Sequence, residues 1–261
     1  MTSESTAHPI VALWCHPRSM STAVERIMRE RRDFTCFHEP FIYYYYVHLG
    51  KKPLPHFDID PLQPAGFDAA LARLYEAAQN APVFFKDMSY YVTPEIFTRE
   101  DMAHRITHTF LIRDPRKSIV SYYKLDPGLE LDEIGLEAQW RHLDWVREIT
   151  GTTPAVIEAE YIQRDSRAAI GKLWRHLDVA FDARAFEWSA EAVPEEWQQV
   201  AGWHETASAR TRIVADAEAD DVAIQSRFDA AAAEAPQLRD YLAHHAPFYE
   251  KLKACSLNSN D

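Results

Sequence analysis

Short apolar runs alternate along this chain with longer stretches in which apolar positions recur at helical spacing. The runs have the length of buried strands, and they lie at Ile10–Cys15, Thr35–Phe37, Val83–Asp87, Thr107–Ile112 and Ala155–Glu158. Strands that alternate with helices form βαβ units with right-handed crossovers. The pattern therefore predicts an α/β fold: a single three-layer domain with a mostly parallel central sheet flanked by helices.

The stretches between the strands predict helices. They cover Ala23–Arg32, Phe67–Asn80, Glu130–Thr150 and Ser166–Leu177. The third should end at Gly151, because glycine readily takes the left-handed conformation that follows a helix. The pair Asp165 and Ser166 can cap the fourth, because such side chains accept hydrogen bonds from the first turn. Apolar positions in Ala230–Ala233 and Leu238–Tyr249 indicate a helical hairpin packed on the domain.

Composition narrows the possible classes of function. A chain of 261 residues with 47% hydrophobic positions suits one domain, and we expect residues 1–8 and 256–261 to be flexible. The formal charge of −12 disfavours nucleic acid and polyanions as partners. Three cysteines without paired spacing are typical of reduced thiols. A polar N-terminus and the lack of a long apolar stretch predict a cytoplasmic protein without membrane contact.

Candidate chemistry begins where the first apolar run ends, in the loop His16–Thr22. A strand that leads into a Ser/Thr/Arg loop at a helix N-terminus directs N–H groups, hydroxyls and a guanidinium at one place, which suits a phosphate or a sulfonate. The loop lacks the glycines and the lysine of the Walker motif, and no G-x-G-x-x-G follows any strand. We therefore expect an anion-binding site that does not bind a nucleoside triphosphate in the way a Walker motif does.

A second strand–turn–helix pattern follows the run Thr107–Ile112. Pro115 suits the first helical turn, because the N–H group that it lacks would be unpaired there. Arg113 and Ser121, eight positions apart, could bind one more phosphate. Arg18, Lys86 and Arg113 each lie at the carboxyl end of a different strand, and ligands of open parallel sheets bind at that edge. The three side chains are therefore predicted to meet in one crevice.

Together these two motifs resemble the sulfotransferase family, whose members bind a 5′-phosphosulfate in a strand–loop–helix and a 3′-phosphate through a distant Arg and Ser. The loop Pro17–Thr22 is most similar to small, often bacterial members with Arg-Ser-x-Ser-Thr. The resemblance implies a P-loop-NTPase-like fold and transfer of a sulfuryl group from 3′-phosphoadenosine 5′-phosphosulfate (PAPS), without a metal, to a hydroxyl or amine of a small acceptor. The implied PAPS contacts are Arg18, Ser19, Met20, Ser21, Thr22, Arg113, Ser121 and, in a late loop, Arg210, Thr211 and Arg212.

The acceptor must lose a proton as it attacks, so a base must lie within hydrogen-bond reach of it. In the branch that the loop resembles, a glutamate before a proline shortly after the first helix acts as the base, and Glu39 matches it, with His38 as the alternative. Cytosolic members use a histidine two residues after the lysine of the third strand, where this chain has Met88. Lys86 is placed to reach the sulfonate or the bridging oxygen.

The sequence says less about the residues that bind the acceptor. Tyr43, Tyr44, Tyr90 and Tyr91 could form an aromatic wall for a small acceptor, or could pack a covering helix. Two other classes of function stay open: a nucleotide kinase or other phosphotransferase, and a non-catalytic homologue that binds the product nucleotide PAP. A homo-oligomer also stays open.

Overall fold

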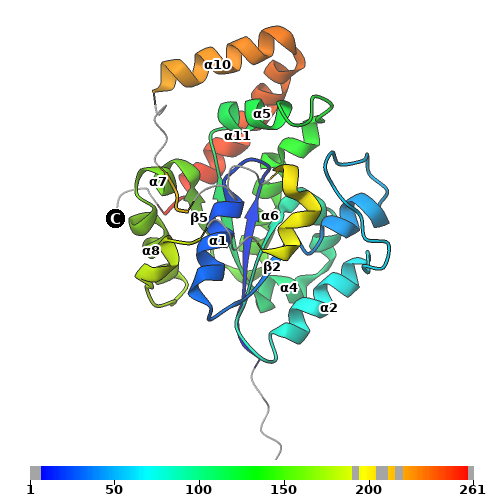
Figure 1. Ribbon diagram of the computed structural model, residues 1–261, viewed down its shortest axis with the longest axis vertical. Helices are drawn as coiled ribbons and strands as arrows, with labels where there is room; N and C mark the ends of the chain where they lie inside the picture. The colour runs from blue at the N-terminus through cyan, green and yellow to red at the C-terminus, as the bar shows by residue number, and fades with distance from the viewer. Residues whose placement is uncertain (1–6, 190–193, 204–210, 215–219, 258–261) are drawn as a thin grey trace, which may run out of the picture.

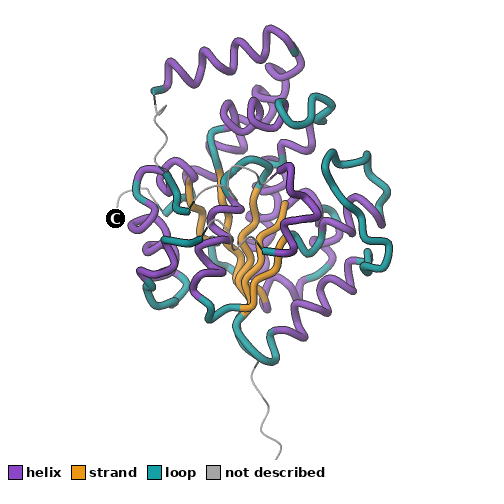
Figure 2. The backbone as a smooth tube through the Cα atoms, viewed as in Figure 1, coloured by secondary structure: helices purple, strands orange, loops and turns teal. Residues whose placement is uncertain are grey.

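The computed structural model describes residues 7–189, 194–203, 211–214 and 220–257 (Figures 1 and 2). Five parallel strands form one sheet in the order β2-β3-β1-β4-β5. They are β1 (Ile10–Cys15), β2 (Thr35–His38), β3 (Val83–Met88), β4 (Ile106–Ile112) and β5 (Ala155–Glu158). Helices cover both faces of the sheet (Figure 1). The α/β fold predicted from the pattern is confirmed.

The central strand β1 is buried along its whole length, as parallel strands covered on both faces usually are. In its register Ile10 lies opposite Val83 on one side and Ile106 on the other. The strand β3 is also buried throughout, although it carries Lys86 and Asp87 near its carboxyl end. Burying a charged group costs free energy unless the group is paired. The two buried charges therefore indicate that the carboxyl end of β3 belongs to a functional site.

The helices are α1 (Ser21–Arg31), α2 (Phe67–Ala77), α3 (Ser89–Val92), α4 (Glu100–Arg105), α5 (Pro115–Tyr123), α6 (Leu136–Thr150), α7 (Ala159–Arg164), α8 (Ser166–His176), α10 (Asp221–Glu234) and α11 (Gln237–Ala254). Short helices of other types are η1 (Tyr44–His48), η2 (Glu95–Thr98), η3 (Leu131–Ile134), η4 (Ala183–Phe186) and η5 (Glu195–Val200). Of the predicted capping pair, Asp165 caps α8 by accepting from Ala168 N, and Ser166 is the first residue of the helix. The helices α10 and α11 form the predicted hairpin. None of the described helices combines the length and the apolar character that crossing a bilayer requires.

The single helix predicted over Glu130–Thr150 is wrong, because Gly135 interrupts it with a φ of 79°. A Cβ atom at this position would lie 3.1 Å from Tyr90 Cδ1 and 3.3 Å from His16 Cβ. Glycine is therefore needed both for the left-handed backbone and for the close approach to the loop after β1. The break places the start of α6 beside that loop.

Three residues within the ends for which we expect flexibility, 1–8 and 256–261, form hydrogen bonds or packing contacts, and the flexibility itself stays a prediction. His8 N donates to Ala78 O at 2.8 Å. Ser256 is buried and its hydroxyl donates to Glu158 Oε1 at 3.0 Å, while Leu257 N donates to Val156 O. Ser256 and Leu257 therefore lie beside β5, where Ser256 bridges Val156.

Candidate active site

The loop between β1 and α1 leaves the N-terminus of α1 open. Arg18 and Met20 have φ values of 63° and 74°, a left-handed conformation that costs non-glycine residues free energy. In the described part of the chain no side chain caps α1, and its first turn holds no acidic residue. The positive end of the helix dipole therefore faces the carboxyl edge of the sheet without a resident negative charge.

The hydroxyl groups of this loop are buried at the same place. Ser19 is fully buried, and its Oγ has no hydrogen-bond partner among the described residues. Ser21 and Thr22 are 5% and 8% exposed. A buried polar group without a partner costs about 1–3 kcal/mol. A bound oxyanion would satisfy the Ser19 hydroxyl.

Arg18 and Arg113, predicted to meet from separate strands, do lie together. Arg113 Nη1 donates to Arg18 O at 2.8 Å. Arg18 Nε donates to Ser121 Oγ at 3.0 Å and its Nη1 to Trp203 O at 2.7 Å, both neutral groups. Burial and then the nearby Arg113 lower the pKa of Arg18 to about 10. The pair of guanidinium groups therefore favours an anion between them.

His16 joins this loop to β4. Its ring is fully buried, and Nε2 accepts a hydrogen bond from Arg113 N at 3.1 Å. Burial, and then the charge of Arg113, lower the pKa of His16 to about 3. The imidazole is therefore neutral at physiological pH, as an acceptor of that hydrogen bond must be.

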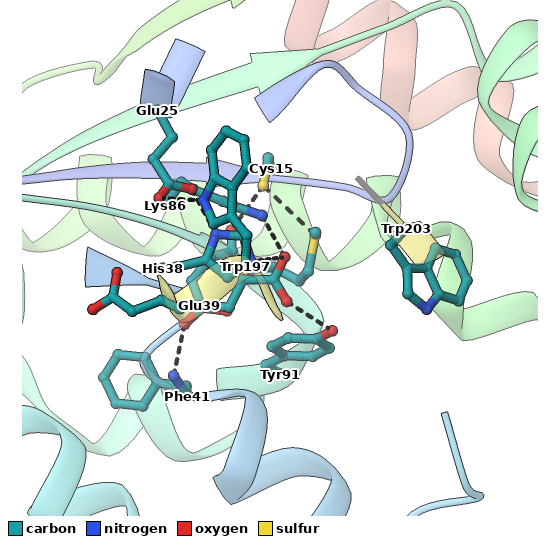
Figure 3. A network of polar contacts seen from close by, with 12 residues as sticks. Cys15, Glu25, His38, Glu39, Phe41, Lys86, Tyr91, Trp197 and Trp203 are labelled. Carbon is teal, nitrogen blue, oxygen red and sulfur yellow. Dashed lines mark hydrogen bonds and ion pairs between the residues drawn. The ribbon is translucent and has the colours of Figure 1, made fainter. Parts of the chain in front are cut away.

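Lys86 lies beside the predicted base, and its meeting with the two arginines in one crevice stays a prediction. Its Nζ forms an ion pair with Glu39 Oε1, and Tyr91 OH donates to Glu39 Oε2 at 3.5 Å (Figure 3). Burial would lower the pKa of Lys86, but the pKa is raised, and Glu39 is the largest of the causes that raise it. Glu39 has a φ of 42°, a strained conformation of the kind that clusters at functional sites. His38 is the next residue toward the N-terminus and lies in the same network.

Two buried carboxylates were missed by sequence reasoning. Asp87 accepts hydrogen bonds from Phe41 N and Met88 N, both at 2.8 Å, and so ties the segment after β2 to β3. Burial and then Glu39 raise the pKa of Asp87 well above its usual value. Glu25 of α1 is fully buried against His38. The available signal was a charged residue inside an apolar run or on the buried face of a helix.

Met88 lies where cytosolic relatives would carry the base. Its Sδ is 3.5 Å from Cys15 Sγ in the buried interior. Burial raises the pKa of the Cys15 thiol to about 12. Neither sulfur atom is therefore suited to take a proton from an acceptor at neutral pH.

A cavity of about 370 Å³ opens beside His38 and Glu39, between β2, α2 and η5. Its lining includes Phe57, Gln63 and Gln199. The four predicted substrate tyrosines do not line it. Tyr43, Tyr44 and Tyr91 are buried in aromatic packing, and Tyr90 lines a second cavity of about 460 Å³ together with Tyr45 and Arg141. A role of these tyrosines in acceptor binding stays a prediction.

The late loop is described only in part. Arg210 lies outside the described residues. Thr211 and Arg212 are exposed, and Thr211 O accepts from Trp188 N at 3.0 Å. Their contact with a nucleotide stays a prediction. Within the described ranges, no three His, Cys, Asp or Glu side chains gather in a way that could hold a metal ion.

The comparisons with known proteins concern the family and the fold. The family described as "Sulfotransferase domain" matches residues 9–255. Two Arabidopsis thaliana proteins, branched-chain-amino-acid aminotransferase-like proteins 2 and 1, are each 26% identical over 76% of this chain, which spans only 35% of their length. A sulfotransferase from Alicyclobacillus acidocaldarius has a similar fold, with a TM-score of 0.54 at 14% identity over 95% of this chain and 96% of that one. Because the family match covers nearly its whole length, this chain belongs to the sulfotransferase domain family.

Proposed function

We propose that this protein transfers a sulfuryl group from PAPS to a hydroxyl or amine of a small acceptor. One observation carries the proposal: the uncapped N-terminus of α1 lies beside the half-buried pair Arg18 and Arg113 and the buried, unpartnered hydroxyl of Ser19. An uncapped helix N-terminus beside two guanidinium groups and a buried hydroxyl offers several donors to a multiply charged anion. The nucleotide PAPS is such an anion, and the family membership favours it over other phosphates.

The donor would bind across both strand–loop–helix units. The N–H groups and hydroxyls of Ser19–Thr22, with Arg18, would hold the 5′-phosphosulfate. Arg113 and Ser121 would bind the 3′-phosphate, so the hydrogen bond from Arg18 to Ser121 would give way to phosphate contacts. Arg210, Thr211 and Arg212 would close over the same phosphate.

The transfer step follows from the pairing of Lys86 with Glu39. The acceptor oxygen or nitrogen forms a bond to sulfur while the bond from sulfur to the 5′-phosphate oxygen breaks and PAP leaves. Negative charge grows on the departing phosphate, where the donors of Ser19–Thr22 and Lys86 stabilise it. When Lys86 turns toward the sulfonate, the carboxylate of Glu39 is released to accept the proton of the acceptor. Donor binding would thus prepare the base.

The acceptor would reach Glu39 through the cavity beside His38. A volume of about 370 Å³ is in the range of small-molecule sites. Amide side chains such as Gln63 and Gln199 can orient a polar acceptor there. A small acceptor therefore fits this site better than a polymer does.

Calorimetric titration with PAP and with ATP tests the donor. We expect PAP to bind more tightly, and preference for ATP with no response to the 3′-phosphate would indicate a nucleotide phosphotransferase instead.

Transfer of labelled sulfate from PAPS to a panel of small alcohols and amines, with water as a further acceptor, tests catalysis. Glu39→Gln should lower turnover roughly 100-fold or more, the scale of general base catalysis, with PAP affinity nearly unchanged. PAP binding without any transfer would identify a non-catalytic homologue.

A further inference from the structure

A second buried carboxylate, that of Glu25 on α1, belongs to the same polar network as Glu39 (Figure 3). Its Oε2 lies 2.6 Å from His38 Nδ1. Its Oε1 accepts from Arg29 Nε at 2.7 Å and from Trp197 Nε1 at 3.0 Å. Burial would raise the pKa of Glu25, but His38 and Arg29 outweigh it and hold the pKa below its usual value. Glu25 is therefore an anion fixed from three sides.

This contact determines which nitrogen of His38 can take up a proton. A carboxylate accepts hydrogen bonds only, so Nδ1 carries the hydrogen and Nε2 is the basic nitrogen of the neutral ring. Nε2 lies 3.9 Å from Glu39 Oε1. His38 also lines the cavity beside Glu39. The basic nitrogen of the ring is thus held next to the carboxylate of the proposed base.

The backbone of Glu39 makes this arrangement possible. Successive side chains of a strand point to opposite faces, so His38 at the end of β2 and the residue after it would normally diverge. The left-handed φ of 42° at Glu39 breaks that alternation. The backbone strain is thus located where it lets two adjacent side chains enter one network.

We propose that Glu25 is a positioning residue that holds His38 as a proton relay behind Glu39; this inference rests on the proposed sulfuryl transfer. The acceptor proton moves to Glu39 and then to His38 Nε2, leaving Glu39 ionised again and forming an imidazolium that Glu25 stabilises. The 3.9 Å gap exceeds a hydrogen bond, so a bridging water or rotation of the Glu39 carboxylate completes the path. The proton then leaves His38 for solvent through the cavity, and Lys86 returns to Glu39.

The charges around His38 favour transfer of the proton from Glu39 to the imidazole ring. On α1, Glu25 pairs with Arg29, which also pairs with Glu196 of η5. On β3, Lys86 pairs with Glu39, and Asp87 has a raised pKa, which favours its neutral form. Arg73 and Asp58 line the same cavity. When Lys86 turns to the sulfonate, Glu39 loses its paired cation, while Glu25 keeps its contact with His38. A positive charge on the ring is then stabilised until PAP departs.

Nitrogen-15 NMR of labelled imidazole in the wild-type protein tests the positioning without any activity measurement. We expect neutral His38 to carry its hydrogen on Nδ1, and the Glu25→Gln variant to show a mixture of tautomers. Glu30→Gln makes the same change on α1, at a residue that pairs with Arg26, and should leave the tautomer unchanged. A hydrogen on Nε2 in the wild type overturns the inference whether or not the protein is a sulfotransferase.

Release of labelled sulfate from PAPS, with water or a panel acceptor, tests the relay. Glu25→Gln and His38→Gln should each lower turnover roughly 10- to 100-fold, part of the usual effect of proton transfer catalysis, with the KM for PAPS nearly unchanged. The double variant should lose no more than His38→Gln alone, because Glu25 acts through His38. Multiplicative losses overturn the relay and leave sulfuryl transfer standing. A wild-type protein that neither binds PAP nor releases sulfate contradicts the proposed function itself.

Discussion

The two strand–loop–helix units of this protein, β1–α1 and β4–α5, have similar sequence patterns but differ at the start of the helix. In the second unit Asp114 accepts a hydrogen bond from Arg116 N at 2.9 Å, so the chain's own carboxylate occupies the helix N-terminus. In the first unit the described residues place no acidic group or capping side chain there. A strand followed by a polar loop and a helix therefore predicts an anion site only where no internal anion takes the position.

The second unit supports the first with side chains instead of with its helix N-terminus. Arg113 donates to His16 Nε2 through its backbone N and to Arg18 O through its guanidinium. Ser121, two turns into α5, accepts from Arg18. The two units therefore form one site with one open helix end. Adding a carboxylate to the first helix end and removing it from the second tests this difference.

Placing a carboxylate at the open end should have the largest effect. Met20→Asp gives α1 an internal anion, as α5 already has, and should weaken PAP binding by about 2–4 kcal/mol through repulsion. Asparagine has the same shape without the charge and also tolerates the left-handed backbone, so Met20→Asn is the matched control and should stay within a few-fold of wild type. Calorimetric titration with PAP measures both. Equal losses in the two variants would show that shape, not charge, matters at this position.

Removing the main side chain contributed by the second unit should have the next largest effect. Arg113→Ala should weaken PAP binding by about 1.5–3 kcal/mol, the scale of a hydrogen bond to a charged group. Arg113→Lys, which keeps the charge but not the planar fork, should fall between this variant and wild type. An unchanged affinity in Arg113→Ala would place the 3′-phosphate elsewhere.

Sequence reasoning located the five strands, the first loop and Pro115 because these features depend on local periodicity and backbone chemistry. It could not find the break at Gly135, where the approach of Tyr90 and His16 decides the conformation. It also missed Glu25 and Asp87. Their partners lie on elements distant in the sequence, and only the folded sheet brings them together.

The capped end of the second unit should matter for stability more than for binding. Asp114→Ala removes the cap of α5 and the ion pair with Arg116, and should lower the free energy of unfolding by about 1 kcal/mol. Asp114→Asn keeps a capping oxygen and should lose less. Denaturant titration measures stability, and PAP affinity should stay within about threefold in both variants. A large loss of affinity with unchanged stability would mean that this helix end also contacts the nucleotide.

His16, which links the two units, should make stability depend on pH. In the folded protein its pKa is lowered to about 3, whereas an unfolded histidine titrates near 6.5. The unfolded chain therefore binds an extra proton as the pH falls below about 6.5, and the free energy of unfolding decreases from there toward pH 3. For His16 alone the decrease between pH 7 and pH 6 is less than about 1 kcal/mol. Denaturant titrations of wild type and His16→Gln across this range isolate the contribution, with pH 8, where histidine is neutral in both states, as the reference. Parallel curves would mean that His16 has the same pKa in the folded and the unfolded protein, and would contradict the shift that burial and Arg113 produce.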